Sequence, residues 1–306
     1  MNLIFMGTPD FAVPSLNAVC EAGHTVKLVI TQPDKPKGRK MILTPPPVKA
    51  RALELGLPVE QPESMRDESI LAKMADVDAD CIVVAAYGKI LRRDVLEMTR
   101  LGCINVHSSL LPRHRGAAPI NWAVIKGDKT TGVTIMQLDE GIDTGDILLQ
   151  AETAIDPDET AGELHDRLAD MGAELLVKAL ELAEKGQLEP VKQNDELSCY
   201  APMLDKSLSA IDWNVSARQV HDLVRGIQPW PVAQTRVNGS VLKVHKTRVT
   251  DGKGESGTVI CANPLTVACG EGAVEIIELQ AEGGKRMAAA DYLRGHPIEC
   301  GTVLGE

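Results

Sequence analysis

The chain has few aromatic residues, no long apolar runs and no paired cysteines. Phe, Trp and Tyr make up only 3% of the 306 residues, so a core must be built mainly from Val, Ile, Leu, Ala and Met. No apolar run reaches the roughly 18 residues that a membrane-spanning helix needs, so we expect no membrane association. The seven cysteines include no Cys-x-x-Cys pair and no cluster, which indicates reduced thiols in a cytoplasmic protein and argues against a zinc site.

An excess of positive charge is also missing. The formal net charge is −11 at pH 7, which argues against broad, unselective binding to nucleic acid. The negative excess lies entirely in residues 1–205, with 21 Lys and Arg against 32 Asp and Glu, whereas residues 206–306 hold 11 of each. Any contact with nucleic acid must therefore use local basic patches.

The first two thirds of the chain alternate short apolar runs with segments of helical spacing. Residues 80–86 form a continuous run rich in β-forming residues, which is typical of a strand buried on both faces. A further strand is expected at 102–107, and it ends with Asn105 and His107. Strands separated by helices predict a mostly parallel α/β sheet with right-handed crossovers. Ligands gather at the carboxyl ends of such strands.

The pattern changes towards the end of the chain. A long amphipathic helix is expected from 160 to 185, with Thr160 and Glu163 at the spacing of a capping box. Short strand candidates separated by Gly, Asn and Asp turns follow at 232–237, 241–249, 257–261, 265–269 and 273–280. They predict a small antiparallel barrel. We therefore expect three parts: a first domain at 1–189, a linker at 190–205 and a second, smaller β-barrel domain at 206–306.

Three polar side chains are candidates for acyl transfer. Asn105 and His107 are two residues apart and face the same side of a strand, and Asp143 lies in the turn Gly141–Gly145. An amide can donate to a developing oxyanion, an imidazole can carry a proton near neutral pH, and a carboxylate can orient that imidazole. No Ser or Cys nucleophile is needed if the acceptor is an amine. A strand-end Asn that caps a loop and a His with a backbone partner would give the same spacing, so spacing alone leaves both interpretations open.

A short basic stretch is the second candidate site. Lys35, Lys37, Arg39 and Lys40 lie within six positions, and the Pro and Gly between them exclude a helix. The stretch fits either a solvated turn or an arm that contacts nucleic-acid phosphates.

The surroundings of these residues resemble the folate-dependent formyltransferases. The likeness is carried by Asn105-x-His107-x-Ser109-Leu110-Leu111-Pro112, Arg115-Gly116 and Asp143-Thr144-Gly145. The run Gly7-Thr8-Pro9-Asp10-Phe11, together with Ile211-Asp212-Trp213 and Pro229-Trp230-Pro231, narrows it to the branch that formylates methionyl initiator tRNA. The likeness covers nearly the whole chain.

The resemblance implies a fold, a reaction and roles for particular residues. The expected fold is a Rossmann-like, mostly parallel N-terminal domain joined to an OB-like barrel that contacts tRNA. The residues implied are Asn105, His107 and Asp143 for catalysis, Ser109, Leu110, Leu111 and Pro112 for folate binding, and Lys35, Lys37, Arg39 and Lys40 for tRNA binding. The formyl donor would be 10-formyltetrahydrofolate, without a metal, and the acceptor methionyl initiator tRNA. The enzyme would be a cytoplasmic monomer. His114 stands where the family usually has Trp, so we expect it to alter the wall of the folate site.

Two alternatives remain. A sibling formyltransferase would act on a sugar-nucleotide amine or on glycinamide ribonucleotide, but the second domain and the basic stretch argue against it. A non-catalytic α/β nucleotide-binding protein would use the barrel for RNA contacts, but the Asn105, His107 and Asp143 set argues against that.

Overall fold

The computed structural model describes residues 1–38 and 41–305, and the chain divides into two compact units. The first unit comprises residues 1–116, 132–153 and 165–200, and the second comprises 117–131, 154–164 and 201–306. Each unit is thus assembled from three separate stretches of sequence. The boundaries expected at 189 and 206 stay a prediction.

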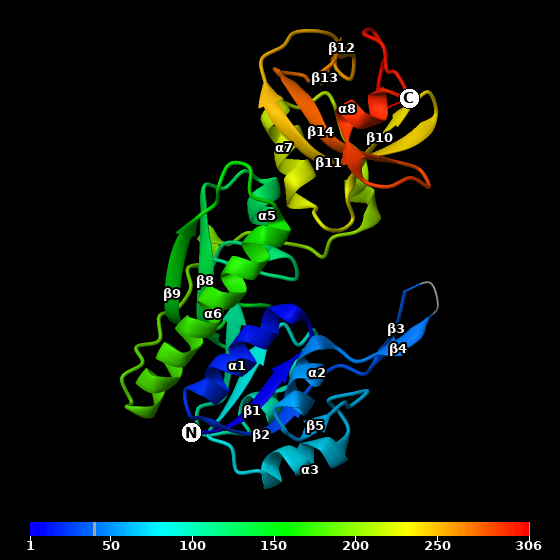
Figure 1. Ribbon diagram of the computed structural model, residues 1–306. Coiled ribbons are helices and arrows are strands. Elements are labelled where there is room, and N and C mark those ends of the chain that lie inside the picture. Colours follow the sequence, from blue (N-terminus) through cyan, green and yellow to red (C-terminus); the bar gives the residue numbers. More distant parts are fainter. Residues whose placement is uncertain (39–40, 306) are drawn as a thin grey trace. The chain divides into compact units, whose positions relative to one another are not determined.

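A seven-stranded sheet forms the centre of the first unit (Figure 1). Its strands lie in the order β5 (Val59–Glu60), β2 (Thr25–Ile30), β1 (Asn2–Gly7), β6 (Cys81–Ala85), β7 (Cys103–His107), β8 (Thr130–Gln137) and β9 (Ile147–Ala154). The pairs from β5 to β7 are parallel, whereas β7 and β8 run antiparallel. Because β8 runs antiparallel to β7, Thr134 of β8 lies opposite His107 at the carboxyl end of β7.

Continuous apolar runs make the central strands. All five residues of β6 and all five of β7 are buried, as expected for strands covered on both faces. Gly7 ends β1 where a Cβ would lie 2.9 Å from Ala12 Cβ and 3.0 Å from the carbonyl oxygen of Ala85. Only glycine therefore fits this close approach of strand and following helix.

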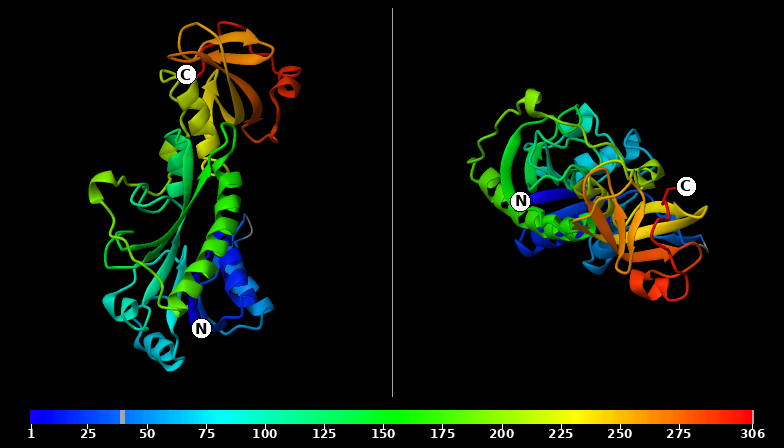
Figure 2. Two further views of the ribbon diagram at one scale, coloured as in Figure 1. Left: turned by 90° about the vertical axis from the view of Figure 1, so that its left-hand side faces the viewer. Right: turned by 90° about the horizontal axis from the view of Figure 1, so that it is seen from above.

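Helices cover both faces of this sheet (Figure 2). Met74 of α3 packs on one face, in a cluster with Ile4 and Ile82. Gly172 of α6 lies on the other face, where its Cβ position is 2.8 Å from Val106 Cγ1. The helices of this part of the chain are α1 (Val13–Glu21), α2 (Pro47–Glu54), α3 (Glu68–Asp76), α4 (Arg93–Leu96) and α6 (Ala161–Glu184), with single 3-10 turns η1 (Asp10–Ala12) and η2 (Asp195–Leu197).

The long helix α6 begins and ends as the sequence predicts. The Thr160 hydroxyl accepts from the backbone N–H of Glu163, and the Glu163 carboxylate accepts from the backbone N–H of Thr160. Gly186, at φ 67°, follows the last turn in the left-handed conformation that commonly ends a helix.

The basic stretch forms part of a hairpin that projects from the first unit (Figure 1). Strands β3 (Lys35–Lys37) and β4 (Ile42–Thr44) pair antiparallel, with Lys35 opposite Thr44 and Lys37 opposite Ile42. In the described part of the basic stretch, where Lys35–Lys37 form β3, the exclusion of a helix is confirmed, although the sequence did not predict strands here.

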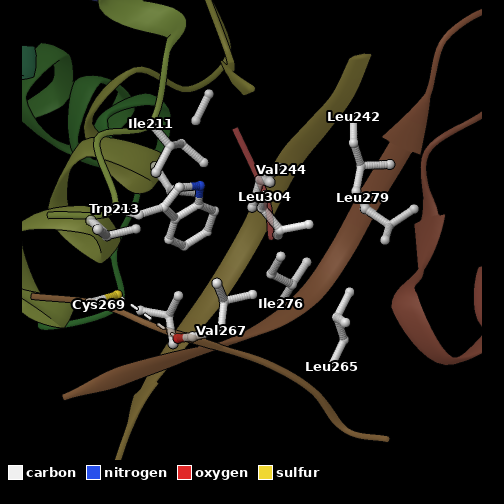
Figure 3. Close-up of a cluster of buried hydrophobic side chains, with 14 of the residues drawn as sticks. Ile211, Trp213, Leu242, Val244, Leu265, Val267, Cys269, Ile276, Leu279 and Leu304 are labelled. Atoms are coloured by element: carbon white, nitrogen blue, oxygen red, sulfur yellow. Dashed lines mark hydrogen bonds between the residues drawn. The ribbon is translucent and has the colours of Figure 1, made fainter. Parts of the chain in front are cut away.

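The second unit contains an antiparallel sheet around an aliphatic core. Its strands are β10 (Ala233–Val237), β11 (Ser240–Thr250), β14 (Ala273–Ala281), β13 (Leu265–Ala268) and β12 (Val259–Ala262), with β15 (Met287–Ala288) beside β14. Helices α5 (Pro119–Ile125), α7 (Ala217–Gly226) and α8 (Ala289–Leu293) and the 3-10 turn η3 (Lys206–Ser209) complete it. The aromatic side chain of Trp213 is buried in this core and packs among Ile211, Val244 and Leu304 (Figure 3).

The predicted fold class is confirmed. The protein is α/β, with a mostly parallel Rossmann-like sheet in the first unit and a separate antiparallel β domain in the last third of the chain. Within residues 1–38 and 41–305, no helix is both long and apolar enough to span a membrane.

Candidate active site

Strand β7 brings Asn105 and His107 to the carboxyl edge of the sheet. The two residues are two positions apart along the strand and therefore point to the same face. On the neighbouring strand β8, Met136 lies opposite Asn105 and Thr134 lies opposite His107. Asn105 is 9% exposed and His107 is 6% exposed, so both side chains are largely withdrawn from water.

The side-chain amide of Asn105 has no hydrogen-bond partner within the described residues. None of the residues in 1–38 and 41–305 gives or accepts a side-chain hydrogen bond with it, although the residue is nearly buried. Neither polar atom of this amide is among the buried side-chain atoms that lack a partner, so both are open to solvent and within reach of a ligand. Its two N–H donors are free for an oxygen atom of a substrate.

His107 lies between a backbone carbonyl and the carboxylate of Asp143. Its Nε2 is 3.0 Å from the carbonyl oxygen of His114, and its Nδ1 is 3.6 Å from Asp143 Oδ2. Because a carbonyl oxygen only accepts, Nε2 carries the hydrogen and donates it. A neutral His107 then has its lone pair on Nδ1, which faces the carboxylate. A proton that reaches Nδ1 would lie beside a negative charge, so this pair is suited to accepting one.

The carboxylate of Asp143 is held by a turn in an unusual conformation. Asp143 has φ 53°, a left-handed value that few residues other than Gly, Asn and Asp adopt. Its Oδ2 accepts a 2.8 Å hydrogen bond from the backbone N–H of Gly116. Two oxygens of Asp139 accept from the Thr144 hydroxyl at 2.8 and 2.9 Å and so close the turn. At Gly145 a Cβ would collide with the carbonyl oxygen of Gln137, so only glycine fits there.

The loop expected to bind folate is fixed by hydrogen bonds to its own backbone. Ser109 is fully buried, and its hydroxyl donates to the carbonyl oxygen of Arg113 at 2.7 Å. Leu111 is also buried, whereas Leu110 and Pro112 are partly exposed. The partly exposed Leu110 and Pro112 offer an apolar surface for a ring system. The buried Ser109 fixes the loop through its hydrogen bond to Arg113. The folate role of all four residues stays a prediction.

His114 is buried, and its expected effect on the wall of the folate site stays a prediction. It is 2% exposed, its backbone N–H donates to Cys199 Sγ at 3.2 Å, and its carbonyl oxygen accepts from His107. Its ring also contacts Cys199, with Nδ1 3.6 Å from Sγ, so both the backbone and the ring of His114 contact this cysteine.

The lysines of the hairpin are exposed, and the base of the hairpin is firmly tied. Lys49 Nζ lies 2.8 Å and 2.9 Å from the two oxygens of Asp34, and the amide of Gln61 donates to Asp34 at 2.8 Å. These hydrogen bonds hold the pKa of the Asp34 carboxyl below its usual value. Lys35 and Lys37 are exposed, whereas Arg39 and Lys40, the other two predicted residues, lie outside the described residues.

Several residues that build this site were not singled out from the sequence. Thr134 and Gln150 bond to the Ser109–Leu111 loop, and Gln193 bonds to the Asp143 turn. The run Gly132-Val133-Thr134-Ile135-Met136 also resembles the formyltransferases, and this likeness was a signal for Thr134. Gln193 lies in a stretch without periodicity and gave no such signal. No group of three or more His, Cys, Asp or Glu in the described parts of the chain is arranged to hold a metal ion.

Comparison with known proteins gives matches along the whole chain. A family described as "Formyl transferase" matches residues 1–180, and one described as "Formyl transferase, C-terminal domain" matches residues 203–297. A methionyl-tRNA formyltransferase of Pelobacter propionicus is 50% identical over 306 residues, which cover 99% of this chain and 96% of that protein.

Solved structures share the fold at low sequence identity. An N-formyltransferase from Helicobacter canadensis, in complex with folinic acid and dTDP-3-aminofucose, has a TM-score of 0.70 at 19% identity over 93% of this chain and 99% of that one. A structure of HypX from Aquifex aeolicus has a TM-score of 0.66 at 18% identity and covers 96% of this chain. The chain spans only 48% of that HypX chain.

Proposed function

The chain belongs to the formyl transferase family, and from this we propose that Asn105, His107 and Asp143 perform its chemistry. The reaction transfers the formyl group of 10-formyltetrahydrofolate to the α-amino group of methionyl initiator tRNA. The product is N-formylmethionyl-tRNA, which serves translation initiation. The protein is thus a transferase, and its formyl donor is a co-substrate.

The amine of the methionyl group attacks the formyl carbon, and a carbon–nitrogen bond forms. The carbonyl oxygen becomes a tetrahedral oxyanion, to which the Asn105 amide donates a hydrogen bond. The proton lost by the amine passes to Nδ1 of His107, where Asp143 stabilises the resulting imidazolium. Collapse of the intermediate breaks the bond to the folate nitrogen, which takes up the proton held by His107, directly or through a water molecule. His107 is then neutral again, as it was at the start.

The Asn105 amide, which has no partner within the described residues, is the observation that supports this proposal most. It lies two residues from a His107–Asp143 pair with 3.6 Å between Nδ1 and Oδ2. A strand-end Asn with only a capping role would bond to its own loop, yet no such bond exists within the described residues. An amide donor beside a proton acceptor is the arrangement that amine acylation requires.

For the acceptor we propose that the hairpin contacts tRNA phosphates through Lys35, Lys37, Arg39 and Lys40. Lys35 and Lys37 are exposed, which supports this role. The contact between Lys49 and Asp34, which fixes the base of the hairpin, also supports it. We also propose that the OB-like C-terminal domain contacts the same tRNA. A monomer located in the cytoplasm would meet both substrates.

A formylation assay tests this function. The purified chain is incubated with 10-formyltetrahydrofolate and charged initiator tRNA, and formylmethionine is measured after deacylation. A matched reaction replaces the tRNA with a sugar-nucleotide amine. We expect product with tRNA alone. Product with the sugar amine and none with tRNA would overturn the proposal in favour of a sibling formyltransferase, and no product with either would exclude this chemistry.

A further inference from the structure

We propose that Gln193 is a positioning residue that holds the carboxylate of Asp143 beside His107. The inference rests on the proposed catalytic role of Asp143, and it gives the stretch 190–205, expected as a linker, a direct part in the site. Gln193 is 50 residues from Asp143 along the chain, so nothing local in the sequence links the two.

The amide of Gln193 uses all of its hydrogen-bonding capacity on the two segments that fix Asp143. Its Nε2 donates to the carbonyl oxygen of Asp143 at 2.8 Å and to that of Gly145 at 2.7 Å. Its Oε1 accepts from Nε and Nη2 of Arg115 at 3.0 and 2.8 Å. Carbonyls only accept and a guanidinium only donates, so the orientation of the amide is determined by its partners.

The two sides of this network meet at the Asp143 carboxylate. Nε2 of Gln193 binds the backbone of the turn in which Asp143 has φ 53°. Oε1 of Gln193 binds Arg115, whose neighbour Gly116 donates its backbone N–H to Asp143 Oδ2. Gln193 therefore fixes both the turn that carries the carboxylate and the segment that the carboxylate binds. Loss of the amide would leave the bond between Gly116 and Asp143 and the backbone bond from Arg115 to Cys199, so the two segments would be held less firmly.

Residues 190–200, the stretch around Gln193, are mostly exposed and contact the site through few side chains. Of residues 190–200, only Gln193 and Cys199 are not exposed. Both of these face the site, since Cys199 Sγ accepts from the backbone N–H of His114. The segment is aligned by Val191, whose backbone N–H and carbonyl both pair with Ile147 at 2.8 Å. Since its apolar side chains Val191 and Leu197 are exposed, hydrogen bonds hold this stretch in place, and those of Gln193 act together with the backbone bonds of Val191 and Cys199.

Arg115 also pairs with Asp195, which gives the control. The distance between Nη2 and Oδ1 is 2.7 Å, but the Asp195 side chain is 81% exposed. The Arg115 side chain is 11% exposed, but a pair whose carboxylate lies mostly in water is screened and contributes little. Asp195→Asn removes the negative charge of this pair and leaves all four bonds of Gln193.

The experiment compares Gln193→Met, Gln193→Glu and Asp195→Asn in steady-state formylation. Met keeps the length of the side chain without its polar atoms. Glu keeps the partner of Arg115 but sets a carboxylate against two carbonyl oxygens. We expect both Gln193 variants to lower kcat by about 10- to 100-fold, the scale of a misplaced catalytic group, with KM for each substrate changed by less than about threefold. Asp195→Asn should keep the wild-type kcat.

A double-mutant cycle separates positioning from a general loss of structure. In an Asp143→Asn background, Gln193→Met should lower kcat by no more than about twofold further, because its effect passes through Asp143. An equal loss in both backgrounds would overturn the inference, and so would a wild-type kcat in either folded Gln193 variant. If Gln193→Met does not fold, the same comparison is made with Gln193→Glu. Wild-type activity of Asp143→Asn alone would instead refute the proposed role of Asp143.

Discussion

The hydroxyl of Thr134 donates a hydrogen bond of 2.7 Å to the carbonyl oxygen of Ser109. The oxygen of the same hydroxyl accepts from the backbone N–H of Leu111 at 3.1 Å and from Nε2 of Gln150 at 2.9 Å. A single buried hydroxyl on β8 thus joins both ends of the Ser109–Leu111 loop that follows β7. The antiparallel pairing of these strands places Thr134 directly opposite His107, so the loop and the proposed catalytic histidine share one support.

Thr134→Val should therefore weaken folate binding. Valine has the shape of threonine but leaves the Ser109 carbonyl and the Leu111 N–H without the hydroxyl that they bond to, each at a cost of about 1–3 kcal/mol. We expect KM for 10-formyltetrahydrofolate to rise about tenfold, equivalent to about 1.4 kcal/mol, with a smaller change in KM for tRNA. Thr134→Ser, which keeps the hydroxyl, is the control. An unchanged folate KM in a folded Thr134→Val protein would show that the loop does not bind the donor.

Asn105→Ala should lower kcat by about 100- to 1,000-fold, the usual loss for one oxyanion donor. Since the donor acts on the transition state, KM should change little. Saturating steady-state kinetics measure both quantities. Asn17→Ala serves as a control, because that amide oxygen accepts from Arg51 Nε and the residue lies on α1. A wild-type kcat for Asn105→Ala would eliminate the oxyanion role.

Replacing Lys35 and Lys37 together by Gln should weaken tRNA binding and spare the folate site. Removing one lysine that neutralises a phosphate reduces the slope of log K against log salt by about one. Titrations of tRNA at several salt concentrations give that slope, and folate KM is followed in parallel. Lys185→Gln, at an exposed position after α6, should leave the slope unchanged. An identical slope for the double variant and the wild type would mean that neither lysine binds a phosphate.

The stability of the second unit should fall as the pH drops below about 6.5 because of His221. This side chain is 3% exposed, with Nδ1 3.0 Å from Thr247 Oγ1 and Nε2 3.1 Å from the Pro157 carbonyl oxygen. Burial lowers its pKa, and the charge of Arg218 lowers it further. The folded form therefore favours neutral His221, and its contribution is complete above the unfolded pKa and is lost as the pH falls through the folded one.

Unfolding of the wild type and of His221→Gln, followed between about pH 7 and about pH 5, measures this dependence. Asp222, Arg225 and Asp158 also face the ring, through contacts or charge, and they are present in both proteins. The wild type should lose more of its free energy of unfolding over this interval than the variant. Parallel curves would assign the pH dependence to other groups.

Alkylation should distinguish the buried thiols from the exposed one. Burial raises the pKa of Cys103 to about 12 and also raises that of Cys81, so neither forms a thiolate near neutral pH. Cys300 is exposed. With iodoacetamide at about pH 8, mass spectrometry should find Cys300 modified first, and Cys81 and Cys103 only after denaturant is added. Early modification of Cys103 would mean that β7 opens in the native protein.

Local signals in the sequence explain which parts of the fold could be predicted. The run 80–86 is apolar after Asp80, and Thr160 with Glu163 marks the start of α6, so both elements were expected. The pair β3 and β4 was not, because Lys35–Lys37 contains no apolar alternation. Helix α5 also escaped prediction, since its seven residues are too short to establish a helical period.

The same distinction applies to the site. Asn105 and His107 share one strand, so their common direction follows from the period of two. The 3.6 Å approach of Asp143 to His107 depends on two turns and on residues far along the chain. The resemblance to the formyltransferases identified Asp143 as a site residue. The contact of Gln193 with the Asp143 turn could be found only in the three-dimensional structure, because no periodic pattern marks a side chain that bonds only to backbone and guanidinium.

The docking of residues 190–200 also orders events during synthesis. A ribosome completes Asn105, His107 and Asp143 well before it adds Gln193, which follows Asp143 by 50 residues and Arg115 by 78. A nascent chain that ends at 189 holds every proposed catalytic group but lacks the amide that braces the turn. An isolated catalytic fragment should accordingly end after Tyr200. A growing chain cannot reach its full activity before residues 190–200 have been added.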